Sequence, residues 1–177
     1  MSVAVCTVEG VVSHQILSAQ RDADAEKVGN KAANLIFLSK VAPEHFSVPT
    51  LHAIPHRTIK MFIQDYAPSS FDMIWHCFCK EMCGKRALTP EARKHLQQLE
   101  RWCCEAFSRY GHGMVSIAKF IKALPRTARV MVRSTGREDT VKLANAGGNK
   151  TCINIPRTED GISKAIGEVV ASYFSER

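Results

Sequence analysis

The chain has 177 residues, of which 45% are hydrophobic, and a formal net charge of +7. This length favours one domain with one sizeable core, and the charge is compatible with a polyanionic ligand, either nucleotide or nucleic acid. The sequence has no run of about 18 apolar residues, so we expect no membrane span. It also lacks the pattern of a secretory signal, so we expect a cytoplasmic location. The seven cysteines, an odd number, indicate reduced thiols rather than a disulfide framework.

The first predicted helix follows Gly29-Asn30, with Ile36 and Phe37 at helical spacing, so Lys31 falls in its first turn. The start of a helix favours anions, and a lysine there is unfavourable by about a few tenths of a kcal/mol unless a ligand anion shares the site. The pattern therefore indicates either an anion site at Lys31 or an ordinary solvated lysine.

A proline-bearing strand is predicted over residues 48–54, and helices follow through residues 56–125. Ser70 is expected to cap a helix that ends at Gly84, Thr89-Pro90 to open a second, and Pro125 to stop a third. After a further strand pair, Thr158 is expected to cap the last helix. The residues expected to face the core are Phe71, Ile74, Trp75, Phe78 and Met82, then Leu96, Leu99, Cys103 and Phe107, then Met114, Ile117, Ala118, Ile121 and Leu124, and finally Ile162, Ala165, Ile166, Val169, Val170 and Tyr173.

Residues 130–155 combine features of an anion-binding site. An apolar strand leads to Arg133, a glycine-rich loop contains Gly147 and Gly148, and a β-favouring run begins at Thr151. A guanidinium offers a planar fork of donors for phosphate oxygens, and backbone amides of glycines approach phosphate closely. A glycine pair between two strands is also ordinary hairpin chemistry.

Together these segments resemble the N-terminal nucleotide-binding domain of the phosphoenolpyruvate synthase and pyruvate phosphate dikinase family, which has an ATP-grasp fold. The family's motif glycine-glycine-lysine-glycine-alanine-asparagine-leucine is similar to residues 29–35, with Asn30 and Ala32 in place of glycines. Its valine-arginine-serine-serine motif, glutamate-aspartate pair and alanine-glycine loop are similar to residues 132–135, 138–139 and 146–147.

The resemblance implies an α/β (α+β) fold, an ATP-grasp-like N-terminal subdomain that has a small mixed sheet with a helical insertion. Residues 1–177 would form a single partial ATP-grasp domain. Its parts would be the lysine loop, helix and strand over 28–55, the helical segment over 56–125, and the arginine strand, glycine-rich loop and final helix over 126–177.

The resemblance also implies site residues. Lys31 and Arg133 would contact ATP phosphates, and the loop with Ala146, Gly147, Gly148 and Thr151 would cover them. Mg²⁺ would accompany ATP, but its principal protein ligands would lie downstream, in the second half of the ATP-grasp domain.

The carboxylates of Glu138-Asp139 could help to bind Mg²⁺ or orient Arg133, or they could instead satisfy local backbone donors and neutralise Arg137. Two further patterns have alternatives. His76, Cys79 and Cys83 share a helix face that could bring ligands together around zinc, although buried free thiols are the simpler interpretation. His112 suggests a phosphoryl-accepting nucleophile, although a residue in a helix-to-helix loop is the simpler interpretation.

We therefore expect the ATP-binding portion of a phosphotransferase, which would transfer phosphate to a carrier histidine in another domain. The chain would be a fragment of a larger enzyme or a naturally short protein, and in isolation it would be inactive, because in-line phosphoryl transfer needs metal ligands and an acceptor. The alternatives are a non-catalytic nucleotide-binding or regulatory module and, third, a basic nucleic-acid-binding protein.

Overall fold

The computed structural model describes residues 3–7, 28–41, 43, 48–66, 69–84, 87–111, 115–135 and 149–175, and within them it has mixed α/β structure, as expected. In chain order the elements are β1 (Val3–Thr7), α2 (Asn30–Val41), β2 (Leu51–Ile54), α3 (His56–Tyr66), α4 (Phe71–Met82), α5 (Pro90–Tyr110), α6 (Val115–Ala123), β3 (Arg129–Ser134), β4 (Thr151–Pro156) and α7 (Glu159–Ala171). No described helix combines the length and the apolar character that a membrane crossing requires.

The four strands form one sheet in the order β2-β1-β3-β4, and every described pairing is antiparallel. The prediction of a mixed sheet is therefore wrong for these strands. The reason is β1, which the sequence patterns did not identify although Val3, Val5 and Thr7 are β-branched. Since β1 lies between β2 and β3 and runs opposite to both, those two strands point the same way but are not neighbours.

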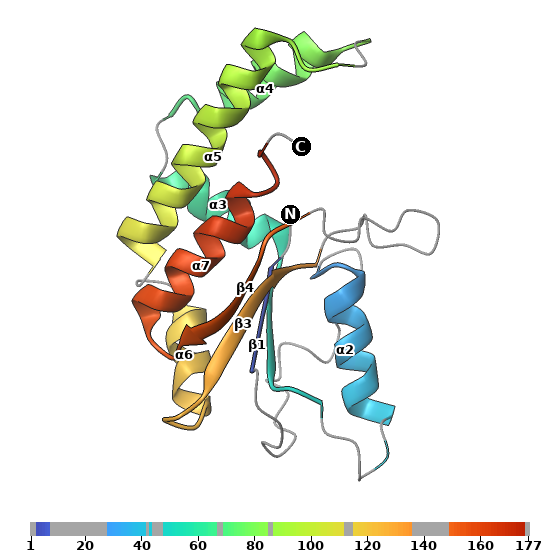
Figure 1. Ribbon diagram of the computed structural model, residues 1–177, viewed down its shortest axis with the longest axis vertical. Helices are drawn as coiled ribbons and strands as arrows, with labels where there is room; N and C mark the ends of the chain where they lie inside the picture. The colour runs from blue at the N-terminus through green and yellow to red at the C-terminus, as the bar shows by residue number, and fades with distance from the viewer. Residues whose placement is uncertain are drawn as a thin grey trace.

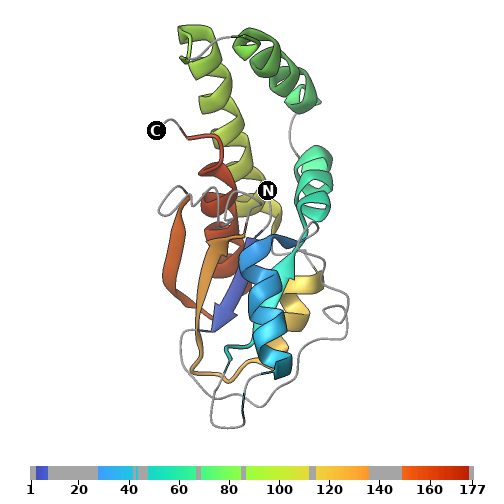
Figure 2. The ribbon, with the colours of Figure 1, turned by 90° about the vertical axis from the view of Figure 1, so that its right-hand side faces the viewer.

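Helices cover both faces of the sheet (Figure 1, Figure 2). α7 packs on β3 and β4, and the long helix α5 packs on the outer side of α7. α2 lies on the opposite face, against β2. α4 and the first half of α5 project beyond the end of the sheet at which β3 ends (Figure 1).

Local capping explains where the long helices begin. Thr89 Oγ1 accepts a hydrogen bond from the amide of Ala92 at 3.1 Å, and Thr158 Oγ1 accepts one from the amide of Gly161 at 3.1 Å. Both predicted caps are confirmed, and each satisfies a backbone donor that a helix start leaves unpaired. Ser70 precedes α4 as expected, but its side chain makes no capping hydrogen bond.

The main core lies between the sheet and α5, α6 and α7. The predicted inward positions of α5 and α7 are buried, including Leu99, Phe107, Ile162 and Ile166. One other expectation is wrong, since the side chain of Trp75 is 42% exposed. On α2, Phe37, which shares the helical spacing of the buried Ile36, is 61% exposed.

The exposed aromatics have a common explanation. On this face of the sheet, Val28, just before α2, and Ala32 and Ile36 of α2 lie four residues apart and pack with Leu51, so Phe37 is turned away from the sheet. α4 buries Phe71 against its neighbours, which include α3, α5 and the residues after α7, but these leave Trp75 partly uncovered.

A β-bulge lies in β4, close to the end of the sheet where Arg133 is found. Val132 pairs with Cys152 but Val130 pairs with Ile155, so two residues of β4 oppose one of β3. Asn154 takes up the extra residue with φ of 58°, a left-handed conformation that Asn tolerates better than most residues. The bulge directs both Cys152 and Ile155 to the core side of the sheet.

Candidate anion-binding site

One end of the sheet collects the residues that the sequence singled out. Val3, at the start of β1, pairs with Ile54 at the end of β2 and with Ser134 at the end of β3. At the same end, Arg133 pairs with Thr151, the first residue of β4. Two predicted site residues from separate segments therefore lie side by side in the sheet.

The start of α2 is joined to this end by a close backbone contact. Gly29 has φ of 82°, and a Cβ atom there would fall 1.0 Å from the carbonyl oxygen of Thr135, so only glycine fits. The Thr135 hydroxyl donates a hydrogen bond of 2.5 Å to the carbonyl of Val28, in a buried position. Residues 107 positions apart thus fix the beginning of α2 against the end of β3 (Figure 1).

Arg133 presents a donor that lacks an acceptor among the described residues. Its side chain is partly buried, and its Nε is buried without a hydrogen-bond partner in the described part of the chain. Buried polar groups in native proteins are nearly always paired, so an unpaired one calls for a ligand or another acceptor. A guanidinium calls for an anion with oxygen acceptors, such as a carboxylate or phosphate.

Lys31 is the second residue of α2, whose first turn has no acidic residue. The lysine is half-buried, and its ammonium adds to the partial positive charge of the helix start. The end of the sheet beside Thr135 therefore combines two cationic residues, Lys31 and Arg133, on segments that are fixed to each other.

Several predicted site residues lie outside the described residues. These are Glu138 and Asp139, the loop residues Ala146, Gly147 and Gly148, and also His112. Thr151 is described, and its side chain is exposed beside Arg133.

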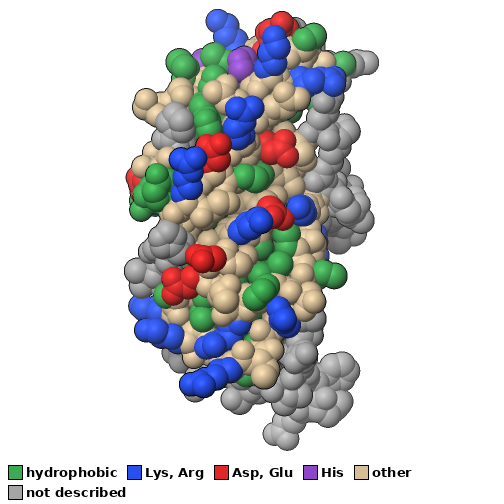
Figure 3. Space-filling view, turned by 60° about the vertical axis from the view of Figure 1, so that its left-hand side comes forward, with side chains coloured by type: hydrophobic (Ala, Val, Ile, Leu, Met, Phe, Trp, Pro, Cys, Tyr) green, Lys and Arg blue, Asp and Glu red, His purple; other side chains and the backbone are tan. Residues whose placement is uncertain are grey.

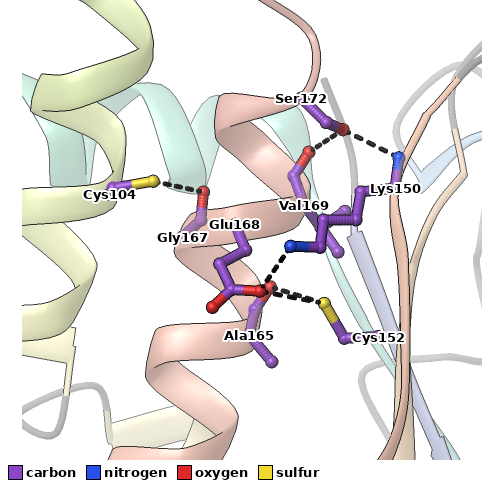
Figure 4. Close-up of polar contacts among 8 residues, drawn as sticks. All are labelled: Cys104, Lys150, Cys152, Ala165, Gly167, Glu168, Val169 and Ser172. Atoms are coloured by element: carbon purple, nitrogen blue, oxygen red, sulfur yellow. Dashed lines mark hydrogen bonds and ion pairs between the residues drawn. The ribbon is translucent and has the colours of Figure 1, made fainter. Parts of the chain in front are cut away.

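A polar cluster that the sequence patterns did not reveal anchors the start of β4 to α7 (Figure 4). The Lys150 ammonium lies 2.8 Å from Glu168 Oε2, and its backbone amide donates to Ser172 Oγ at 3.0 Å. Ser172 in turn donates to the carbonyl of Val169 at 2.7 Å. The only signal in the sequence is a lysine and a glutamate 18 positions apart, too common a pattern to single out.

The ion pair shifts the pKa values of its two members in opposite directions, and both shifts favour the charged form. The hydrogen bond from Lys150 lowers the pKa of Glu168, and the same bond raises the pKa of Lys150. Burial, with the nearby Glu168 carboxylate, raises the pKa of the Cys152 thiol to about 11, and that thiol donates to Glu168 at 3.6 Å. Cys152 therefore stays protonated at neutral pH, which makes it a poor nucleophile.

The helix face with His76, Cys79 and Cys83 is solvent-facing. All three side chains are exposed, so the interpretation of Cys79 and Cys83 as buried thiols is wrong. α4 lacks a neighbouring element over this face in the described part of the chain, and among those residues no three His, Cys, Asp or Glu side chains come together as a metal site would require.

His52 is a half-buried residue on β2, and its Nε2, like Arg133 Nε, is buried without a hydrogen-bond partner in the described part of the chain. It stacks on Phe120 of α6 with ring centroids 5.7 Å apart, and burial lowers its pKa. With its pKa lowered, the ring is neutral at pH 7 and offers an anion no charge, so we assign it no part in anion binding.

The surface around α5 and α7 has mixed charge. Figure 3 shows acidic and basic side chains interspersed over the face turned forward there.

A comparison of the chain with protein-family models, with curated proteins and with solved structures found no match.

Proposed function

We propose that the chain binds the phosphates of ATP at the end of the sheet, through Lys31, Arg133 and the loop that contains Gly147 and Gly148. In this proposal it is the first part of an ATP-grasp-like domain in a phosphotransferase similar to phosphoenolpyruvate synthase and pyruvate phosphate dikinase. The observation that carries the proposal is the contact of Gly29 with Thr135, which holds the start of α2 beside a strand whose Arg133 Nε has no described partner.

The chemistry of these groups suits a polyphosphate. Arg133 would donate from its planar fork to two oxygens of one phosphate, while Lys31 would supply a compact charge to another. Thr151, opposite Arg133 in the sheet, would add a hydroxyl donor at the edge of the same site.

The described residues do not form a metal site, so we assign no step to Mg²⁺. Bound with ATP, the ion would supply charge neutralisation at the phosphates. By the resemblance, its ligands and the carrier histidine lie in other parts of the enzyme, and this chain would bind and orient the nucleotide.

Calorimetric titration with ATP tests the site. We expect weak, saturable binding that Arg133→Ala reduces roughly tenfold to one-hundredfold, because a charged hydrogen-bond partner contributes about 1.5–3 kcal/mol. Arg129→Ala is the matched control, since Arg129 lies exposed on the same strand but pairs with Pro156 at its other end. Equal affinities of the wild type and Arg133→Ala, with both folded by circular dichroism, would remove Arg133 from the site.

Catalysis is tested separately with ATP labelled in its transferable phosphate. Residues 1–177 alone should neither hydrolyse ATP appreciably nor label themselves, because positioning of an acceptor opposite the leaving group is needed for transfer. Robust self-labelling would show that residues of this chain, such as Glu138, Asp139 or His112, perform the chemistry themselves.

A further inference from the structure

A cavity of about 380 Å³ lies between α3, α4 and the residues that follow α7. Its apolar lining includes Ile63, Phe71, Trp75 and Phe174, and its polar lining includes Lys60 and Asp72. The volume falls within the range of small-molecule sites, and a mostly apolar lining with a few polar groups is their usual composition.

Three aromatic side chains shape this cavity. The ring of Phe174 is nearly perpendicular to that of Trp75, at 79° with centroids 5.9 Å apart, and to that of Phe71, at 85° and 6.3 Å. Phe71 and Phe174 are buried, whereas Trp75 is 42% exposed and is held by stacking on Phe78 at 5.5 Å. A flat ring that entered the cavity would find aromatic faces and edges already held in place.

A donor and an acceptor lie next to each other in the lining. The Gln64 amide donates to Asp72 Oδ2 at 2.6 Å, which fixes the carboxylate, while Asp72 Oδ1 lies 3.9 Å from the Lys60 ammonium. At that distance the ion pair is loose, so Oδ1 can accept from a ligand and the ammonium can donate to one.

We propose that this cavity binds a planar heteroaromatic small molecule whose ring edge carries a hydrogen-bond donor beside an acceptor. The ring packs among Phe71, Trp75 and Phe174, its donor meets Asp72, and its acceptor meets Lys60. The cavity is separate from the proposed phosphate site, because its lining residues do not include Lys31, Arg133 or Thr151.

Three rings of equal size test the proposal. 7-Azaindole has a donor beside an acceptor, indole has the donor alone, and benzofuran has no donor. The signals of the two tryptophan side-chain N–H groups, one from Trp75 and one from the buried Trp102, report binding by NMR in the whole chain. We expect 7-azaindole to shift the Trp75 signal in a saturable manner and to bind roughly threefold to tenfold more tightly than benzofuran.

Variants separate this site from other surfaces. Trp75→Ala should weaken binding of all three rings roughly threefold to tenfold, as loss of an aromatic pair does, and Asp72→Ala should abolish the preference for 7-azaindole. Met73→Ala, on the exposed side of the same helix, and Arg133→Ala should leave ring binding unchanged. The Arg133 variant also keeps a failure of the phosphate site distinct from a failure here.

Three outcomes would overturn the proposal. One is the absence of saturable binding, and another is binding that Trp75→Ala does not affect. The third is concentration-dependent self-association, lost in Trp75→Ala and without ring binding, which would assign the cavity to a contact between copies of the chain.

Discussion

Replacement of Gly29 by alanine tests the contact on which the anion site depends. The alanine would have to keep φ near 82°, and its Cβ would fall 1.0 Å from the Thr135 carbonyl oxygen. Because that oxygen belongs to the backbone, no side-chain rotation relieves the clash. The start of α2 must therefore move away from the end of β3.

Two contributions set the expected loss of stability. A non-glycine residue in the left-handed region costs about 1–2 kcal/mol. Separation of the segments also breaks the hydrogen bond from Thr135 to Val28, and a buried carbonyl left without its donor costs about 1–3 kcal/mol. The free energy of unfolding should therefore fall by roughly 2–5 kcal/mol, a large share of the total for a domain of this size.

Gly84→Ala is the matched control. Gly84 also has a positive φ, of 72°, but apart from its two chain neighbours no described residue has an atom within 4 Å of the Cβ that an alanine would add. It should lose only the backbone contribution of about 1–2 kcal/mol. Urea unfolding followed by circular dichroism measures both variants. Equal losses in the two would refute the close approach of Gly29 to Thr135 and, with it, the joining of the two cationic segments.

Three further predictions concern other contacts. Thr135→Val should lower the free energy of unfolding in urea by about 1–3 kcal/mol, because it removes a buried donor, and unchanged stability would count against that hydrogen bond. A double-mutant cycle with Lys150→Met and Glu168→Gln should give about 0.2–1 kcal/mol of coupling at neutral pH. The pair lowers the pKa of Glu168 and raises that of Lys150, so the coupling should be complete between the ordinary pKa values of 4.5 and 10.5. It should disappear as pH falls through the lowered pKa of Glu168 or rises through the raised pKa of Lys150. Coupling that persists at about pH 2 would exclude the ion pair. The Cys79 thiol should react with a disulfide reagent in the folded protein, whereas Cys103, buried and with a raised pKa, should react only after unfolding; equal labelling of the two, measured by peptide mass spectrometry, would contradict their assigned burial.

Helix boundaries could be predicted because their causes are local. Thr89 followed by Pro90, and Thr158 with an acidic first turn after it, place the cap and the helix within a few residues of each other. The inward faces of α5 and α7 were predicted for the same reason, since both helices have a continuous apolar stripe.

Strand pairing and exposure could not be predicted in the same way. The place of β1 in the centre of the sheet depends on contacts with residues more than a hundred positions away. The spacing of Phe37 and Trp75 marks a helix face but does not say whether a neighbour covers it. Both side chains match the helical pattern, but Phe37 lies on the face of α2 turned away from the sheet, and Trp75 is only partly covered by the elements beside α4.

Part of the candidate site could be predicted from local sequence, and part depends on contacts between distant residues. A lysine at a helix start and an arginine at a strand end are visible in the sequence, whereas the contact that joins them, from Thr135 to Val28, links residues 107 positions apart. The structure brings the two segments together, and the roles of Lys31 and Arg133 toward phosphate remain predictions.

The position of β1 also determines the order in which the sheet is completed during synthesis. β1 emerges first and can pair with β2 early, but its other edge belongs to β3, which begins about 120 residues later. At 5–20 residues per second, the ribosome leaves that edge without its native partner for roughly 6–24 s. A bare strand edge is a template for pairing with other chains, so the nascent protein should be most prone to aggregation, and most dependent on chaperones, during this interval.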